Sequence, residues 1–136
     1  MDIEVRQTVD GIGIVGTGVD LVSGQDLLDA TARLREEVEG NPQIRYAVMD
    51  FTAIPEERID TESLRVLATQ RIESMSGIFV VVVAPSDVLF GLSRMWEMLA
   101  EREGLISRVV RTRAEAITWL QDELAQQVEP FRLTER

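Results

Sequence analysis

Three residue types with reactive or titratable side chains are missing from the sequence. Its 136 residues include no cysteine and no histidine, and all 14 basic residues are arginine, so lysine is absent too. Without cysteine there is no disulfide, thiolate nucleophile or cysteine-ligated metal. Without histidine or lysine there is no Ser-His-Asp triad, imidazole shuttle, Schiff base or P-loop. Only carboxylates, hydroxyls and Tyr46 remain as catalytic groups. We therefore expect no catalytic residues, metal ligands or cofactor, and predict that the chain is not an enzyme.

Long apolar runs are also missing. No run approaches the roughly 18 residues that a membrane helix needs, and the acidic start, residues 1–4, does not resemble a signal peptide. The net charge of −10 repels phosphate backbones and anionic lipid heads. We expect one cytoplasmic domain over residues 1–136, with neither nucleic-acid binding nor membrane insertion.

Alternating apolar residues mark the first two strands, at about residues 2–8 and 12–19. Asp10-Gly11 lies between them, and this dipeptide favours a two-residue type I′ hairpin turn. Apolar residues at helical spacing follow, starting after the N-cap candidates Ser23, Ser86 and Thr112. Further strands are predicted at 45–51, 78–84 and 106–111, and helices at 23–40, from about 60, at 87–103 and from 112 to about 128.

This order of elements predicts an α/β fold. A hairpin followed by three strand–helix–strand crossovers gives a mixed five-stranded sheet with four helices, in which only the first strand is antiparallel.

Two local motifs have both a functional and a structural interpretation. Gly11, Gly13 and Gly16 match the dinucleotide-binding pattern G-x-G-x-x-G, but they fall at a hairpin rather than between a strand and a helix. We interpret them as packing glycines. Asp50 ends an apolar strand, as the phosphorylated aspartate of a receiver domain does, but the lysine and the acidic pair of a receiver are absent. Its predicted role is to hold N–H groups of the following loop.

The third predicted helix has a stripe of apolar residues that we expect to face the core. The stripe contains Val88, Leu92, Met95 and Leu99, and it is widened by Leu89 and Trp96. Phe90 then falls on the opposite, polar side, where a large apolar residue marks an interface. The predicted partner or dimer interface consists of Phe90, Arg94, Glu97, Met98 and Glu101.

Two further clusters are candidate sites. Asp60, Thr61, Glu62 and Ser63 open the second predicted helix, either as ordinary capping residues or as a regulatory phosphorylation site. Arg108, Arg111 and Arg113 surround the last strand, either as an anion site at a helix N-terminus or as members of surface ion pairs.

Two segments, Phe79–Met95 and Arg108–Leu120, resemble bacterial proteins of the STAS/Sec14-like group, small SpoIIAA-like relatives of the anti-sigma-factor antagonists. The resemblance is carried by the sequences Ala84-Pro-Ser-Asp87, Gly91-x-x-Arg94-Met95 and Glu115-Ala-x-x-Trp-Leu120, and the order of elements agrees along nearly the whole chain. It implies a STAS/SpoIIAA-like fold.

The resemblance also implies function by binding rather than by chemistry. In the anti-sigma antagonists the second helix opens with a phosphorylated serine, whose place is taken here by Glu62, and this departure argues against a kinase switch. The leading hypothesis is a non-enzymatic regulatory module that binds a protein partner or a second copy of itself. The alternative is a carrier for a small apolar ligand or lipid, with a pocket beneath the third helix.

Overall fold

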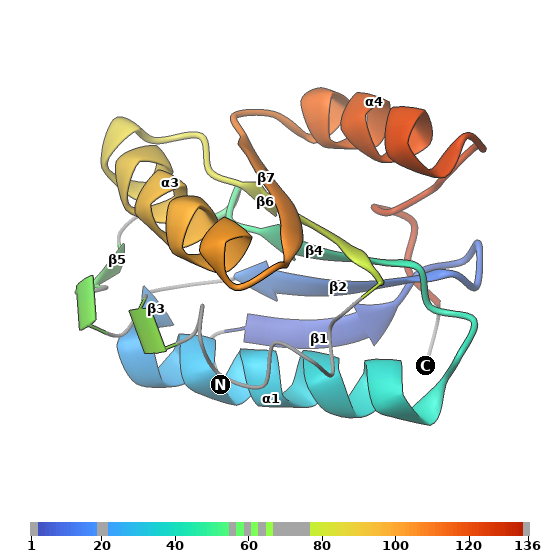
Figure 1. Ribbon diagram of the computed structural model, residues 1–136, viewed down its shortest axis with the longest axis horizontal. Coiled ribbons are helices and arrows are strands. Elements are labelled where there is room, and N and C mark those ends of the chain that lie inside the picture. Colours follow the sequence, from blue (N-terminus) through green and yellow to red (C-terminus); the bar gives the residue numbers. More distant parts are fainter. Residues whose placement is uncertain are drawn as a thin grey trace.

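A mixed five-stranded sheet forms the centre of the protein, with the strand order β1-β2-β4-β6-β7 (Figure 1). The computed structural model describes residues 3–18, 22–54, 57–58, 61–62, 65–66 and 77–134. Only β1 is antiparallel to its neighbour, as predicted. The strands are β1 Ile3–Gln7, β2 Gly13–Gly18, β4 Tyr46–Asp50, β6 Phe79–Val83 and β7 Ile106–Val110. A separate two-stranded parallel ribbon, β3 Val22–Ser23 with β5 Glu57–Arg58, was not predicted.

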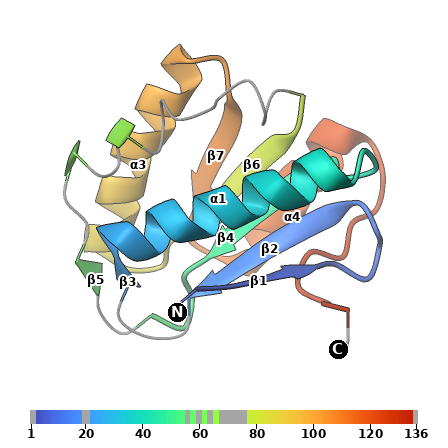
Figure 2. The same cartoon turned by 90° about the horizontal axis from the view of Figure 1, so that it is seen from below.

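Helices cover both faces of the sheet (Figures 1 and 2). α1 Gly24–Gly40 and α3 Asp87–Arg102 pack on one face, and α4 Arg113–Leu124 packs on the other. Three helices are therefore defined in the part of the chain that the structure describes, against four predicted. The second predicted helix lies mostly outside the described residues, although residues 61–62 and 65–66 are described and are helical.

The three helices begin where their capping residues predict. The Ser23 and Thr112 side chains each accept the N–H of the third helical residue, and the acids there, Asp26 and Glu115, return a bond to the cap. Ser86 caps α3 through its side chain alone, which accepts the Leu89 N–H. α4 is shorter than predicted, because Ala125 adopts a left-handed conformation with φ 55° and ends it.

The hairpin between β1 and β2 is present, but the predicted two-residue type I′ turn is not. Such a turn needs a positive φ at both central residues, and in this loop Gly11 has φ +79° whereas Asp10 is not left-handed. The strands instead separate after the bond from the Thr8 N–H to the Gly13 carbonyl. The reason is that the Asp10 side chain is engaged in hydrogen bonds to groups beside the loop.

The glycine pattern is explained by packing, as the structural interpretation predicted. Gly13 lies within the ladder of β2 and β4, and a Cβ atom there would fall 2.2 Å from Cζ of the buried Tyr46 ring. Gly16 is similarly close to Met49, at 2.7 Å from its Sδ atom. The buried Tyr46 ring excludes a side chain at Gly13, and a side chain at Gly16 would require Met49 to shift.

The Asp10 carboxylate joins three distant parts of the chain. Oδ2 accepts hydrogen bonds from the Tyr46 hydroxyl at 2.7 Å and from the Glu129 N–H at 2.8 Å. Oδ1 accepts from the Ile12 N–H at 3.1 Å and from the Thr8 hydroxyl. Burial alone would raise the pKa of Asp10, but these hydrogen bonds outweigh it and hold the pKa below its ordinary value of 3.8. Burial raises the pKa of Tyr46 well above its ordinary value of 10.0, and the nearby Asp10 charge adds to the effect.

Replacing Tyr46 with phenylalanine tests this network. The substitution leaves a partly buried carboxylate without one donor, and we expect it to cost about 1–3 kcal/mol of unfolding free energy at pH 7 in a urea titration. The carboxyl pKa is depressed in the folded state, so its contribution is present above pH 3.8 and disappears as the pH falls below that value. The difference between the two proteins should shrink accordingly.

The raised Tyr46 pKa gives the opposite trend in alkali. The wild-type protein should lose stability as the pH rises above 10.0, because the folded state resists ionisation of this phenol, and the Tyr46→Phe variant should lose less. Equal stability of the two proteins at pH 7 would contradict the role assigned to the hydroxyl.

Candidate functional site

α3 meets the sheet with a different face from the one predicted. Its buried residues are Leu89, Ser93, Glu97 and Ala100. Members of the predicted inner stripe face outward: Val88 is 66% exposed and Met95 is 39% exposed, while Leu92 and Leu99 are half-buried. The predicted orientation is therefore only partly correct. Leu89 is buried, and Leu92, Trp96 and Leu99 pack against the core as predicted. The helix is rotated so that Val88 and Met95 lie on the surface.

A buried carboxylate is the physical reason. Glu97 is 7% exposed, and its Oε2 accepts the N–H of Val109 in β7 at 2.8 Å. Its Oε1 accepts from Nη1 of Arg94, also at 2.8 Å. A buried charge is tolerated when it is paired and hydrogen-bonded in this way. Apolar periodicity counts only apolar positions, and it gives no signal for a helix that buries an acid.

Phe90 and Glu97 do not lie on an exposed face, which corrects part of the predicted interface. Phe90 is half-buried against the core, and the Arg111 guanidinium lies over its ring at 4.1 Å from the centroid. The other predicted members, Arg94, Met98 and Glu101, are exposed.

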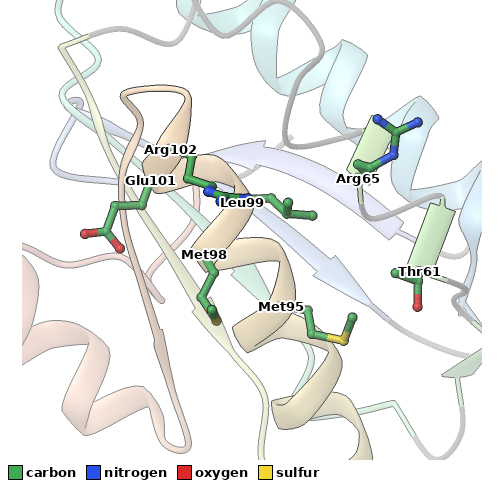
Figure 3. A pocket seen from close by; sticks show the side chains of 7 residues that line it. All are labelled: Thr61, Arg65, Met95, Met98, Leu99, Glu101 and Arg102. Atoms are coloured by element: carbon green, nitrogen blue, oxygen red, sulfur yellow. The ribbon is translucent and has the colours of Figure 1, made fainter.

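A groove of about 650 Å³ lies beside the outward face of α3. Met95 and Leu99 of α3 point across it toward Thr61 and Arg65 (Figure 3). Arg65 forms an ion pair of 2.9 Å with Glu62. The complete lining is Thr61, Arg65, Met95, Met98, Leu99, Glu101 and Arg102.

The candidate regulatory helix start is described only in part. Thr61 and Glu62 are helical and exposed, and Thr61 lines the groove. Asp60 and Ser63 lie outside the described residues. Both interpretations of this segment, capping and regulation, stay predictions.

Two of the three clustered arginines form ion pairs. Arg111 donates to Asp87 at 2.7 Å and to the Pro85 carbonyl at 3.2 Å. Arg113 lies 2.7 Å from Asp50 and stacks 4.9 Å from the Phe131 ring centroid.

Arg108 is exposed on β7 and makes no ion pair with another described residue. The guanidinium groups of Arg111 and Arg113 are thus occupied, as the ion-pair interpretation predicted for them.

Asp50 has the structural role predicted for it. It is 1% exposed at the end of β4, and Oδ1 accepts the N–H of Thr52 in the following loop at 3.1 Å. Oδ2 accepts from Nε of Arg113 at 3.0 Å. This pair connects the end of β4 to the first residue of α4.

The described residues contain no group of three or more acidic side chains placed to hold a metal ion. None of the helices described is both long and apolar enough to cross a membrane.

Comparison with known proteins identifies the fold. No family model matches the sequence, and no curated protein matches it. Among solved structures, the chain is similar to an uncharacterized protein of the DUF3478 family with a SpoIIAA-like fold from Shewanella loihica PV-4. The TM-score is 0.54 at 14% sequence identity, over 87% of this chain and 91% of that chain. At this identity the likeness shows the fold alone: the chain has a STAS/SpoIIAA-like fold, as the sequence resemblance implied.

Replacing Arg113 with methionine tests the buried ion pair. The change leaves the Asp50 carboxylate buried without its cationic partner, and we expect a loss of about 1–3 kcal/mol in unfolding free energy. Arg132→Met is the matched control, because Arg132 and its partner Glu129 have side chains that are 73% and 48% exposed. The control should cost less than about 1 kcal/mol. Equal losses in the two variants would show that Asp50 does not depend on Arg113.

Proposed function

We propose that this chain is a non-enzymatic binding module that engages a protein partner through the outward face of α3. The observation that carries the proposal is the rotated helix: α3 buries Ser93 and Glu97 but exposes Val88 and Met98, the latter to 61%. Apolar side chains gathered on a surface mark interaction sites. Methionine suits such a surface because its flexible, polarisable side chain adapts to different partners.

The groove favours a partner that presents an apolar helical face. It lies between α3 and the described helical residues 61–62 and 65–66, so an added helix would contact Met95 and Leu99. Helix-in-groove recognition uses this kind of apolar lining with apolar anchors at helical spacing. Arg102 is exposed and has no ion-pair partner among the described residues, so it can pair with an acid on the incoming helix.

The fold agrees with a binding role but does not specify the partner. The resemblance to anti-sigma-factor antagonists implies action through protein contacts, and the chain shares a SpoIIAA-like fold with its structural neighbour. A second copy of this chain is one candidate partner, because the same apolar face on two molecules can pair about a two-fold axis.

A small apolar ligand is the second candidate occupant of the same groove. A volume of about 650 Å³ falls within the roughly 300–1,000 Å³ usual for ligand sites. Three apolar side chains line it together with Arg102, whose guanidinium can meet an anionic head group. The lining therefore fits a single-chain amphiphile.

Met98→Glu tests the protein-binding proposal. Met98 is 61% exposed, so the variant should fold normally by circular dichroism. A charge on this face should weaken partner binding at least tenfold in a titration with the purified partner. Val9→Glu is the control, since Val9 is 40% exposed in the β1–β2 loop, away from α3. Binding, or a dimer, that is as tight in Met98→Glu as in Val9→Glu would contradict the proposal.

A fluorescent fatty-acid analogue tests the second candidate. We expect saturable binding of one probe per chain, weakened by Arg102→Ala and by Met95→Glu but not by Val9→Glu. Binding that does not saturate, or that responds equally to all three variants, would remove the ligand hypothesis and leave the protein-binding proposal intact.

A further inference from the structure

β7 lies at the edge of the sheet and offers backbone groups to an added strand. Among the described strands it pairs only with β6. The Val110 carbonyl accepts from the Ala84 N–H at 2.8 Å, so the backbone N–H and C=O of Val110 point toward β6. Successive residues of a strand direct their backbone groups to opposite sides. The backbone groups of Ser107 and Val109 therefore point away from β6, toward the open edge.

The C-terminal segment covers one end of the opposite edge of the sheet. Leu133 forms a bridge to Thr8 at the end of β1. The Val9 N–H donates to the Arg132 carbonyl at 2.8 Å, and the Thr134 N–H donates to the Gln7 carbonyl at 3.0 Å. Backbone groups of the C-terminal segment therefore satisfy part of the β1 edge. At the β7 edge, the hydrogen bond to the Val109 N–H comes from a side chain instead.

That side chain is Glu97. Its carboxylate accepts the outward Val109 N–H at 2.8 Å, in the place where the carbonyl of an added strand would bind. Arg94 holds the other oxygen at 2.8 Å and fixes the carboxylate in position. Charge-assisted hydrogen bonds of this length are stronger than the neutral amide bond that would replace them.

We propose that Glu97 is an autoinhibitory cap that closes β7 to strand addition by a second copy of this chain. The occupant excluded is a second copy, because an antiparallel β7 would place the same outward N–H and C=O groups opposite one another about a two-fold axis. Exposed edges are the usual route of such pairing, and proteins protect them with charged residues. Arg108, exposed on the same strand, adds a like-charge repulsion between two such copies.

Amide hydrogen exchange measures the cap in the wild-type protein. The backbone N–H groups of Val109 and Ser107 both point away from β6, but only the Val109 N–H is held by Glu97. We expect the Val109 amide to exchange at least tenfold more slowly than the Ser107 amide. Glu97→Ala should remove most of that difference, and Glu101→Ala, an exposed acid on the same helix, should leave it unchanged. Equal exchange at Val109 and Ser107 in the wild type would overturn the proposal.

Light scattering measures the consequence for association. Glu97→Ala should show a mass that rises with concentration above that of the wild type, and Ile106→Lys in the same background should restore the wild-type mass, because a lysine on the edge opposes strand pairing. A folded Glu97→Ala protein with a freely exchanging Val109 amide but the wild-type mass would refute the autoinhibition.

If Glu97→Ala does not fold, the isosteric Glu97→Gln takes its place in both measurements. Its neutral acceptor should speed Val109 exchange several-fold and raise the mass at high concentration; no change in either would refute the proposal. Met98→Glu leaves the cap intact, so failure of the cap and failure of the proposed binding surface are separate results.

Discussion

The hydrogen bond from the Val109 N–H to the Glu97 carboxylate fixes which face of α3 meets the sheet. With the acid turned inward, Leu89 and Ala100 enter the core, and Val88 and Met98 are placed outside. The exposed apolar face and the protected edge of β7 are therefore two consequences of one contact. A buried carboxylate without its partners would cost more free energy than the hydrogen bond contributes. This penalty disfavours other rotations of α3 that bury Glu97 away from the Val109 N–H.

Polar contacts have the same organising role elsewhere in the molecule. Asp10 connects the hairpin to β4 and to the segment after α4, and Asp50 connects β4 to the start of α4. Each carboxylate is held by at least two donors. The apolar clusters on the two faces of the sheet supply the burial, and the carboxylates determine how the covering elements are placed on it.

The sequence predicts the fold well because the fold depends on local signals. Caps at Ser23, Ser86 and Thr112 and the apolar run of β6 define most of the elements, and the crossover rule orders them. The candidate site was predicted poorly because it depends on a long-range contact: no spacing within α3 reveals that Glu97 would meet a backbone N–H 12 residues away. The same applies to Arg111, whose place over Phe90 comes from the packing of β7 against α3.

The orientation of α3 can be measured directly because the chain contains no cysteine. Single cysteines introduced at Val88, Met98, Leu89 and Ser93 report their exposure through the rate of labelling by a thiol reagent in dilute protein. The structure predicts rapid labelling at Val88 and Met98, which are 66% and 61% exposed, and slow labelling at Leu89 and Ser93, which are 2% and 6% exposed. Slow labelling at Val88 together with rapid labelling at Ser93 would show that the apolar stripe faces the core, and would contradict both the exposed binding face and the Glu97 cap.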